Sequence, residues 1–327
     1  MGIQVGALHV DQPLTSVSVM YRNGDFVSEQ VYPIVPVQHQ SDDYWVYGVE
    51  NLRTQDDTRR PGSRSNKIDW TLAPVGFKCD GHGLHMPIYD EDRENADAAL
   101  DLDTDSTIEL TDKIFLNREV NCVNSLLANV PTVDLTTLTE TFDSATLDPV
   151  AFLDQQKEAI ANQIGKGPNS FVFSRPAWRA FRSNVNVLKH LFGTSSVGTG
   201  KQISIENAMD LLELENISIA NSVQITSAEN ITPLTAQYVW GQFKDSQGNV
   251  LPNGAMSLLY YRPKSPGLRT VALGYQFTWQ TGRLGSLVFK GRLPDLDHGD
   301  YIEVMRYYAL QNIAPAAGVV FKRCTLS

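Results

Sequence analysis

Residues 89–129 read YDEDRENADAALDLDTDSTIELTDKIFLNREVNCVNSLLAN, and this stretch decides the fold. Apolar residues at positions 116, 120, 123 and 127 are spaced by four, three and four residues, which is the spacing of one buried helix face. Ser106 and Glu109 have the spacing of a capping box, which predicts that the helix begins at Ser106. Pro131 is expected to end it, because proline disfavours helical geometry in the residue before it. The predicted helix is a rod of about 35 Å.

Length and composition limit the class of protein. The 327 residues predict two domains, and 42% hydrophobic with 20% charged residues is the composition of an ordinary soluble globular protein. The formal net charge of −10 argues against a dedicated nucleic-acid-binding protein, which normally has a basic face.

Cysteine usage and the N-terminus predict the compartment. The cysteines at 79, 122 and 324 are odd in number and scattered, which indicates reduced thiols in a cytosolic compartment. The first 26 residues lack a basic segment followed by an apolar core, so we expect no signal peptide. Nowhere do 18 consecutive apolar residues occur, so we expect no membrane partner.

The middle of the chain has the patterns of a mixed α+β domain. Thr- and Asp-rich residues 131–149 resemble a connector. The remaining predicted elements are helices over Pro149–Gly165, from near Arg175 through LKHLFG, and over Ile205–Leu214, and strands over 217–225 and 257–262.

The clearest strand signal is TVALGYQFTWQ at 270–280. Its apolar residues alternate with small or polar ones, which predicts a strand with one buried face. We expect it to pair with DYIEVMRYYA at 300–309, across a connection that contains Gly and Asp. Paired strands beside the long helix would form the second domain.

Residues 50–85 are predicted to form a long two-stranded excursion. The polar residues 51–67 contain a Pro61-Gly62 turn and are followed by strand-like segments at 68–72 and 76–85. An isolated hairpin is marginally stable in water, so we expect this one to lie on another subunit.

The tip of this excursion is basic, and two interpretations of it remain open. It is either a solvated loop or a surface that meets the acidic 90–112 segment of a neighbouring subunit. The candidate contacts between subunits are Arg59, Arg60, Arg64, Asp101, Asp103 and Asp105.

Asp101, Asp103 and Asp105 also resemble the start of a calcium-binding EF-hand loop. Such a loop needs Gly at its sixth position and a bidentate Glu at its twelfth. This chain has Ser106 and Asp112 at those positions. We therefore interpret the aspartates as an acidic lead into a helix, where negative charge favours the helix dipole.

Cys79, His82 and His85 offer zinc ligands within seven residues, but no second ligand pair follows at the usual spacing. GTSSVGTGKQ at 193–202 resembles a phosphate-binding loop but has Ser195 and Gln202 at positions that need Gly and Ser or Thr. The six histidines show no pairing with a nucleophile, and no Gly-x-Ser-x-Gly motif is present. We expect no metal, no cofactor and no enzymatic activity.

Three segments resemble the major capsid proteins of tailed double-stranded DNA bacteriophages, whose fold was first described for phage Hong Kong 97. Residues 90–119 are similar to the pattern D-x-x-R-x-N-A-D-x-P-L-D-L-D, with alanine at 98 or 99 where Pro is common. Residues 26–47 resemble the entry strand, and residues 300–321 resemble the closing strand and its exit.

The resemblance implies an α+β Hong Kong 97-type capsid fold with an N-terminal arm, an extended β-hairpin loop, a long spine helix, and peripheral and axial domains. Its parts are expected at 1–29 (arm), 30–49 (peripheral entry strand), 50–85 (extended loop), 86–149 (peripheral domain, with the spine helix at 104–129), 150–268 (axial domain), 269–311 (peripheral return strands) and 312–327 (axial C-terminal segment).

The function implied by the resemblance is structural. Such a subunit assembles with copies of itself through hexamers and pentamers into an icosahedral shell that encloses the phage DNA without sequence-specific binding. The expected location is the virion, after assembly in the host cytoplasm, with a separate scaffolding protein, a portal and decoration proteins as further partners. Some members cross-link a loop Lys to an Asn of a neighbour. Lys67 and Lys78 are the lysines in or near this loop, but the sequence does not identify the acid that takes part in such a cross-link, so the sequence does not predict one. The alternative is an encapsulin, a nanocompartment shell protein of the same fold.

Overall fold

The structure is a computed structural model. It describes residues 26–47, 53–68, 72–95, 101–135, 140–193, 202–225, 236–241, 243–244, 250–251, 255–267, 270–280, 286–294 and 298–325. The arm expected at 1–29 therefore lies outside the described residues except for its last four, and so does most of the loop at 193–202.

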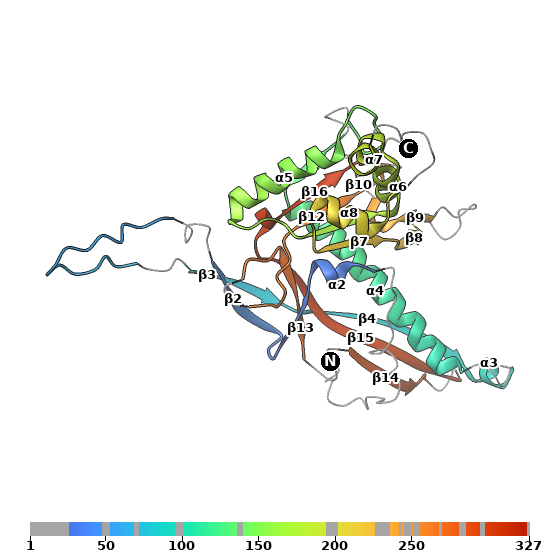
Figure 1. Ribbon diagram of the computed structural model, residues 1–327. Coiled ribbons are helices and arrows are strands. Elements are labelled where there is room, and N and C mark those ends of the chain that lie inside the picture. Colours follow the sequence, from blue (N-terminus) through green and yellow to red (C-terminus); the bar gives the residue numbers. More distant parts are fainter. Residues whose placement is uncertain are drawn as a thin grey trace.

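Two five-stranded sheets form the centres of the two halves of the molecule (Figure 1). The first sheet has the order β1-β13-β15-β14, with β4 also paired to β15. The second sheet has the order β5-β16-β12-β6-β7. The first-sheet strands are β1 (Ile34–Val37), β4 (Asp80–Tyr89), β13 (Gly274–Trp279), β14 (Ser286–Arg292) and β15 (Gly299–Asn312). The second-sheet strands are β5 (Thr132–Asp134), β6 (Ser170–Ser174), β7 (Asn216–Ala220), β12 (Ser257–Tyr260) and β16 (Gly318–Lys322).

The long helix α4 (Leu102–Asn129) runs along the first sheet beside β4 and β15 and reaches toward the second sheet (Figure 1). It begins four residues before the predicted Ser106, which is buried inside the helix. Asp101 is the N-cap, and its side chain accepts a hydrogen bond from the Thr104 amide at 3.4 Å. The capping-box prediction was wrong because Asp101 is an equally competent cap placed one turn earlier. The 28 residues make a helix of about 42 Å.

Helices α5 (Pro149–Ile164), α6 (Arg175–Ser183), α7 (Val185–Phe192) and α8 (Ile205–Leu212) pack on one face of the second sheet (Figure 1). The prediction of α5 is confirmed, with Pro149 in its first turn and Gly165 at φ 71° as the left-handed C-cap. The single helix expected from Arg175 is divided at Asn184. Asn184 causes the break because its side chain accepts from the amides of Asn186 and Val187 and so caps α7.

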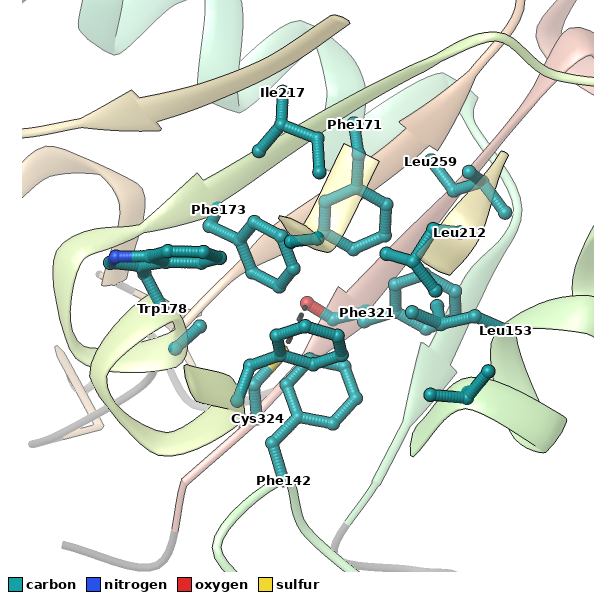
Figure 2. Close-up of a cluster of buried hydrophobic side chains, with 14 of the residues drawn as sticks. Phe142, Leu153, Phe171, Phe173, Trp178, Leu212, Ile217, Leu259, Phe321 and Cys324 are labelled. Carbon is teal, nitrogen blue, oxygen red and sulfur yellow. Dashed lines mark hydrogen bonds between the residues drawn. The ribbon is translucent and has the colours of Figure 1, made fainter. Parts of the chain in front are cut away.

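A cluster of aromatic side chains fills the space between the second sheet and its helices (Figure 2). Phe142, Phe171, Phe173, Phe181 and Phe321 are all 0% exposed. Phe171 and Phe173 come from β6, and Phe321 comes from β16, two strands that the sequence patterns did not predict. Burial of each such ring stabilises the fold by about 1.5–3 kcal/mol.

The predicted pairing of residues 270–280 with 300–309 is confirmed for the two strands but not for the register, since β13 pairs with residues 308–312 of β15. β13 pairs antiparallel with β15, with Phe277 opposite Ala309. The connection between them contains a further strand, β14, which pairs with residues 300–306 of β15. The prediction of one buried face was wrong, since Gln276 and Thr278 are also buried.

Both faces of β13 are covered because different elements pack on each. Gln276 and Thr278 line a small cavity together with Phe115 and Arg118 of α4. On the other face, Phe277 stacks on Phe77 at a ring-centroid distance of 4.4 Å. The alternation in the sequence distinguishes the two faces but does not say what covers the polar one.

The remaining strands and helices are short. They are α2 (Ser28–Val31), α3 (Asp90–Asn95), the 3-10 turns η4 (Val239–Gly241) and η5 (Pro315–Ala317), and the two-stranded pairs β2 (Ser41–Tyr47) with β3 (Leu72–Lys78), β8 (Val223–Ile225) with β9 (Ala236–Tyr238), and β10 (Phe243–Lys244) with β11 (Val250–Leu251). The strand predicted over 217–225 is thus divided into β7 and β8. In the part of the chain that the structure describes, no helix is both long and apolar enough to cross a membrane.

Candidate assembly surfaces

The extended loop projects from the body of the molecule on the antiparallel pair β2–β3 (Figure 1). The pair runs in register from Ser41 opposite Lys78 to Tyr47 opposite Leu72. The excursion predicted over 50–85 is shorter at its C-terminal end, because residues 80–85 belong to β4 and pair with β15. The reason is that ten consecutive β4 residues find partners in the first sheet.

The tip of the extended loop is basic and exposed. Residues 53–68 have exposed side chains throughout. The turn is closed by Arg59, whose Nε donates to the Ser63 carbonyl oxygen at 2.9 Å, with Gly62 at φ 83°. Arg60 and Arg64 lie in the same turn region and are exposed. The candidate arginines therefore form one accessible basic surface.

The candidate aspartates lie at the other end of the molecule, where α3 meets the start of α4 (Figure 1). Asp101 is the α4 cap, and Asp105 is exposed. Asp103 is already paired within the chain: its carboxylate accepts from Arg93 at 2.5 Å and from Lys290. One chain thus carries the two sets of opposite charge at ends that face away from each other.

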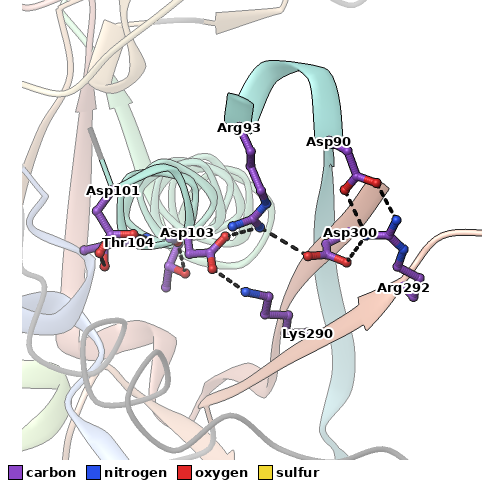
Figure 3. Close-up of polar contacts among 9 residues, drawn as sticks. Asp90, Arg93, Asp101, Asp103, Thr104, Lys290, Arg292 and Asp300 are labelled. Carbon is purple, nitrogen blue, oxygen red and sulfur yellow. Dashed lines mark hydrogen bonds and ion pairs between the residues drawn. The ribbon is translucent and has the colours of Figure 1, made fainter. Parts of the chain in front are cut away.

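Asp103 belongs to a chain of alternating charges that ties α3 and α4 to β14 and β15 (Figure 3). Arg93 also reaches Asp300 at 3.4 Å, and Arg292 bridges Asp300 and Asp90. Burial by itself would raise the pKa of Asp103, but the hydrogen bonds from Lys290 and Arg93 outweigh it and the pKa is lowered. Asp103 therefore has a structural role inside the subunit.

Asp103→Asn should make the subunit less stable at pH 7 by about 1 kcal/mol, since these partly exposed ion pairs contribute modestly. A lowered carboxyl pKa stabilises the fold above the unfolded value near 3.9, and that contribution disappears as pH falls through the folded pKa. The difference between variant and wild type should therefore shrink as pH falls below about 4. Urea unfolding of the unassembled subunit at pH 7 and pH 3 measures this. Asp92→Asn, at an exposed position of α3, is the control at pH 7, and a constant difference across the pH range would contradict the assignment.

Cys79 and His82, which resembled part of a zinc site in the sequence, make contacts with other residues of the fold. The buried Cys79 thiol donates to the Phe277 carbonyl oxygen at 3.5 Å. His82 stacks on Tyr308 at 4.2 Å, and burial lowers the pKa of His82, whereas His85 is exposed. Among the described residues, no three His, Cys, Asp or Glu side chains are grouped to hold a metal ion.

An apolar groove of about 290 Å³ lies at the root of the extended loop. It is lined by Tyr44 and Trp45 of β2 together with Tyr275, Ile313 and Pro266. Trp45 is 49% exposed. The groove is a candidate surface that the sequence patterns did not indicate, because its lining residues come from segments that are far apart in the sequence.

Sequence patterns also gave no role to Arg118 and Glu119 in α4, which are 3% and 0% exposed. Two adjacent charges inside a long amphipathic helix, next to apolar positions that face the core, are the signal that could have identified them. Glu119 accepts hydrogen bonds from the amides of Val27 and Ser28, and Arg118 donates to the Glu29 carboxylate.

No protein-family model matches the chain. Among curated proteins, it is 25% identical over 239 residues to the major capsid protein of Burkholderia phage BcepMu, covering 71% of this chain and 74% of the relative. It is also 27% identical over 220 residues to the major capsid protein of Pseudomonas phage JBD67, covering 65% of this chain and 69% of the relative.

Solved structures share the fold along nearly the whole chain. A phage-related protein from Bordetella bronchiseptica RB50 superposes with a TM-score of 0.71 at 20% identity, covering 98% of this chain and 99% of that one. The capsid structure of cyanophage P-SCSP1u superposes with a TM-score of 0.59 at 10% identity, covering 98% and 92%.

The fold is therefore the α+β Hong Kong 97-type capsid fold, as the resemblance implied. Together with the capsid proteins among the curated relatives, this fold defines the class of protein, which is a shell-forming structural protein that associates with copies of itself. The chain is a homologue of the major capsid proteins of Burkholderia and Pseudomonas phages, and these relatives are structural proteins of the virion capsid.

Proposed function

We propose that this capsid subunit assembles through hexamers and pentamers into an icosahedral shell that encloses the double-stranded DNA of a tailed phage. The observation that carries the proposal is the position of opposite charges at opposite ends of one chain. The basic tip of the extended loop and the acidic end at α3 are too far apart to meet within a subunit (Figure 1). A head-to-tail contact satisfies both, and contacts of that geometry close into rings.

The proposed contact joins the tip residues Arg59, Arg60 and Arg64 to a neighbour's exposed acids. Of the candidate aspartates, Asp105 is the one best placed, since Asp101 caps α4 and Asp103 is paired internally. Glu91 and Asp92 on the outer side of α3 add exposed negative charge beside it. Complementary charges of this kind set the rate and register of docking more than its final affinity.

The proposal extends to the organisation of the shell. The second-sheet half is the axial part around the ring axis, the first-sheet half is the peripheral part, and the extended loop ends where β4 begins. Assembly takes place in the host cytoplasm with a scaffolding protein, a portal and decoration proteins. The capsid interpretation is preferred to an encapsulin because the sequence relatives carry the name of phage capsid proteins.

Reversing the tip with Arg59→Glu, Arg60→Glu and Arg64→Glu should slow assembly by about tenfold at low salt, because electrostatic steering changes association rates by that order or more. Light scattering during assembly measures the rate, and negative-stain electron microscopy identifies shells or rings. The defect should shrink as salt is raised, since exposed charges are screened beyond about 10 Å at 0.1 M salt.

Two further variants make this test specific. Replacing the same three arginines with lysine keeps the charge and should assemble at nearly the wild-type rate. Adding Glu91→Arg, Asp92→Arg and Asp105→Arg to the reversed tip should restore assembly, because it exchanges the two signs. If the reversed tip assembles with the wild-type rate and salt dependence, the tip is a solvated loop.

A further inference from the structure

A buried carboxylate in the middle of α4 holds the chain just after the N-terminal segment. Glu119 is 0% exposed, and both of its oxygens accept hydrogen bonds. Oε1 accepts from the Val27 amide at 3.2 Å and from the Trp240 indole Nε1 at 2.6 Å. Oε2 accepts from the Ser28 amide at 2.9 Å. One side chain thus joins three segments that are far apart in the sequence.

Residues 26–32, here called the arm root, are held by further contacts to α4. The Phe26 ring meets the edge of Phe115 at a centroid distance of 6.4 Å. Arg118, directly before Glu119, pairs with Glu29 at 2.9 Å while being 3% exposed. The neighbouring and oppositely charged residues Arg118 and Glu119 of α4 therefore bind consecutive residues of the arm root, 27–29.

The arm root also touches both sheets. Tyr32 donates from its hydroxyl to the Asn312 side chain at the end of β15, at 2.6 Å. Tyr260 of β12, in the second sheet, donates to the Gln30 carbonyl oxygen at 3.1 Å. The segment therefore lies where α4, the first sheet and the second sheet meet, as its position in Figure 1 also shows.

A carboxylate in this position is costly unless its hydrogen bonds are made. Burial raises the pKa of Glu119, and the hydrogen bonds from Trp240, Ser28 and Val27 oppose that rise. The amides of Val27 and Ser28 lie at the N-terminal end of helix α2, where backbone donors have no partner within the helix. Removing the carboxylate would leave three buried donors unsatisfied, which is the expensive outcome for a hydrogen-bonded cluster.

We propose that Glu119 is a positioning residue that fixes the arm root on α4 and links it to Trp240 of η4. The arm root is then held in place on the body before subunits meet. Ordering the arm root in the free subunit reduces the entropy lost on association, which favours assembly. The anchoring rests on the contacts alone, and only its consequence for assembly rests on the proposed function.

Hydrogen exchange measured by mass spectrometry on the unassembled full-length subunit tests the anchoring. In Glu119→Gln an NH₂ group takes the place of the oxygen that accepts from the Ser28 amide. The hydrogen bond from Ser28 to a charged group is therefore lost, and two hydrogen-bond donors face each other. Exchange in peptides covering residues 26–32 should become at least about tenfold faster, because such a bond contributes about 1.5–3 kcal/mol and 1.4 kcal/mol is a factor of ten. Peptides from α5 and β6 should exchange as in the wild type.

Glu109→Gln is the matched control, since Glu109 lies on the same helix but is exposed and pairs with the exposed Lys113. It should leave exchange at the arm root unchanged. Glu119→Asp keeps the charge and should retain part of the protection that Glu119→Ala loses. Trp240→Phe keeps the carboxylate and its two backbone bonds, so the arm root should stay more protected than in Glu119→Gln.

Equal exchange at residues 26–32 in Glu119→Gln and Glu109→Gln would overturn the anchoring. An increase spread evenly over all peptides would also overturn it, because Glu119 would then serve general stability. Assembly is measured separately by light scattering. Faster local exchange with normal shells would support the anchoring and reject its consequence for assembly, whereas a wild-type subunit that forms no shell would count against the proposed function alone.

Discussion

Phe173→Ala is expected to lower the free energy of unfolding of the subunit by about 3–5 kcal/mol, the cost of removing a large buried ring and leaving a cavity. Phe173 is 0% exposed and lies at the centre of the aromatic cluster in the second half (Figure 2). Its ring centroid is 4.1 Å from that of Phe171, 5.1 Å from that of Phe181 and 5.4 Å from that of Trp178. These rings come from β6 and α6, so they cannot all move inward to fill the space.

Urea unfolding of the unassembled subunit, followed by circular dichroism, measures the change. Ile225→Ala is the control, since Ile225 lies in the same half on β8 but is 55% exposed. A substitution at such a surface position should change the free energy of unfolding by no more than about 0.5 kcal/mol. Similar losses in both variants would mean that the aromatic cluster does not form the core of this half.

Gly274→Ala is expected to destabilise the subunit by about 1–3 kcal/mol or more, because the added methyl group overpacks a site that cannot yield. A Cβ at this position would lie 2.4 Å from the Gln311 carbonyl oxygen and 2.5 Å from the Tyr32 ring. The carbonyl is backbone within the β13–β15 pairing, so relief requires separating the strands where they begin. Tyr32 belongs to the arm root, so its hydroxyl contact with Asn312 should weaken as well.

The same urea titration measures this loss, and hydrogen exchange in peptides covering 272–280 and 308–314 should show where it arises. Gly167→Ala is the matched control, because a Cβ there meets nothing within 4 Å. It should be neutral or stabilise the subunit slightly, as expected for Gly→Ala at a compatible site. If Gly274→Ala is as stable as this control, the close approach of β13 to Tyr32 is absent in solution.

Elements whose signal is local could be predicted well. The existence of the long helix and of the strand β13 follows from periodicity, and α5 follows from periodicity together with its end signals Pro149 and Gly165. β6 and β16 could not be predicted in the same way. Their residues are buried on both faces, so they show no alternation to distinguish a strand from a buried helix segment.

The candidate contact residues also divide into those whose character follows from the local sequence and those whose role depends on distant residues. The exposed, basic character of Arg59, Arg60 and Arg64 follows from the polar sequence around them. The separate roles of the three aspartates do not, because Asp103 is paired with Lys290, a residue 187 positions away. Glu119 had no predicted role for the same reason, since Trp240 is 121 positions distant.

The sequence by itself determined the long helix, the charge at the tip of the extended loop, and the α+β class, because each depends on neighbours along the chain. Only the tertiary structure decided which polar side chains are buried, which acids remain available to a neighbour, and how the arm root is held. Those outcomes depend on contacts between segments separated by tens to hundreds of residues, and the free energy of a buried charge depends on the partners it meets there.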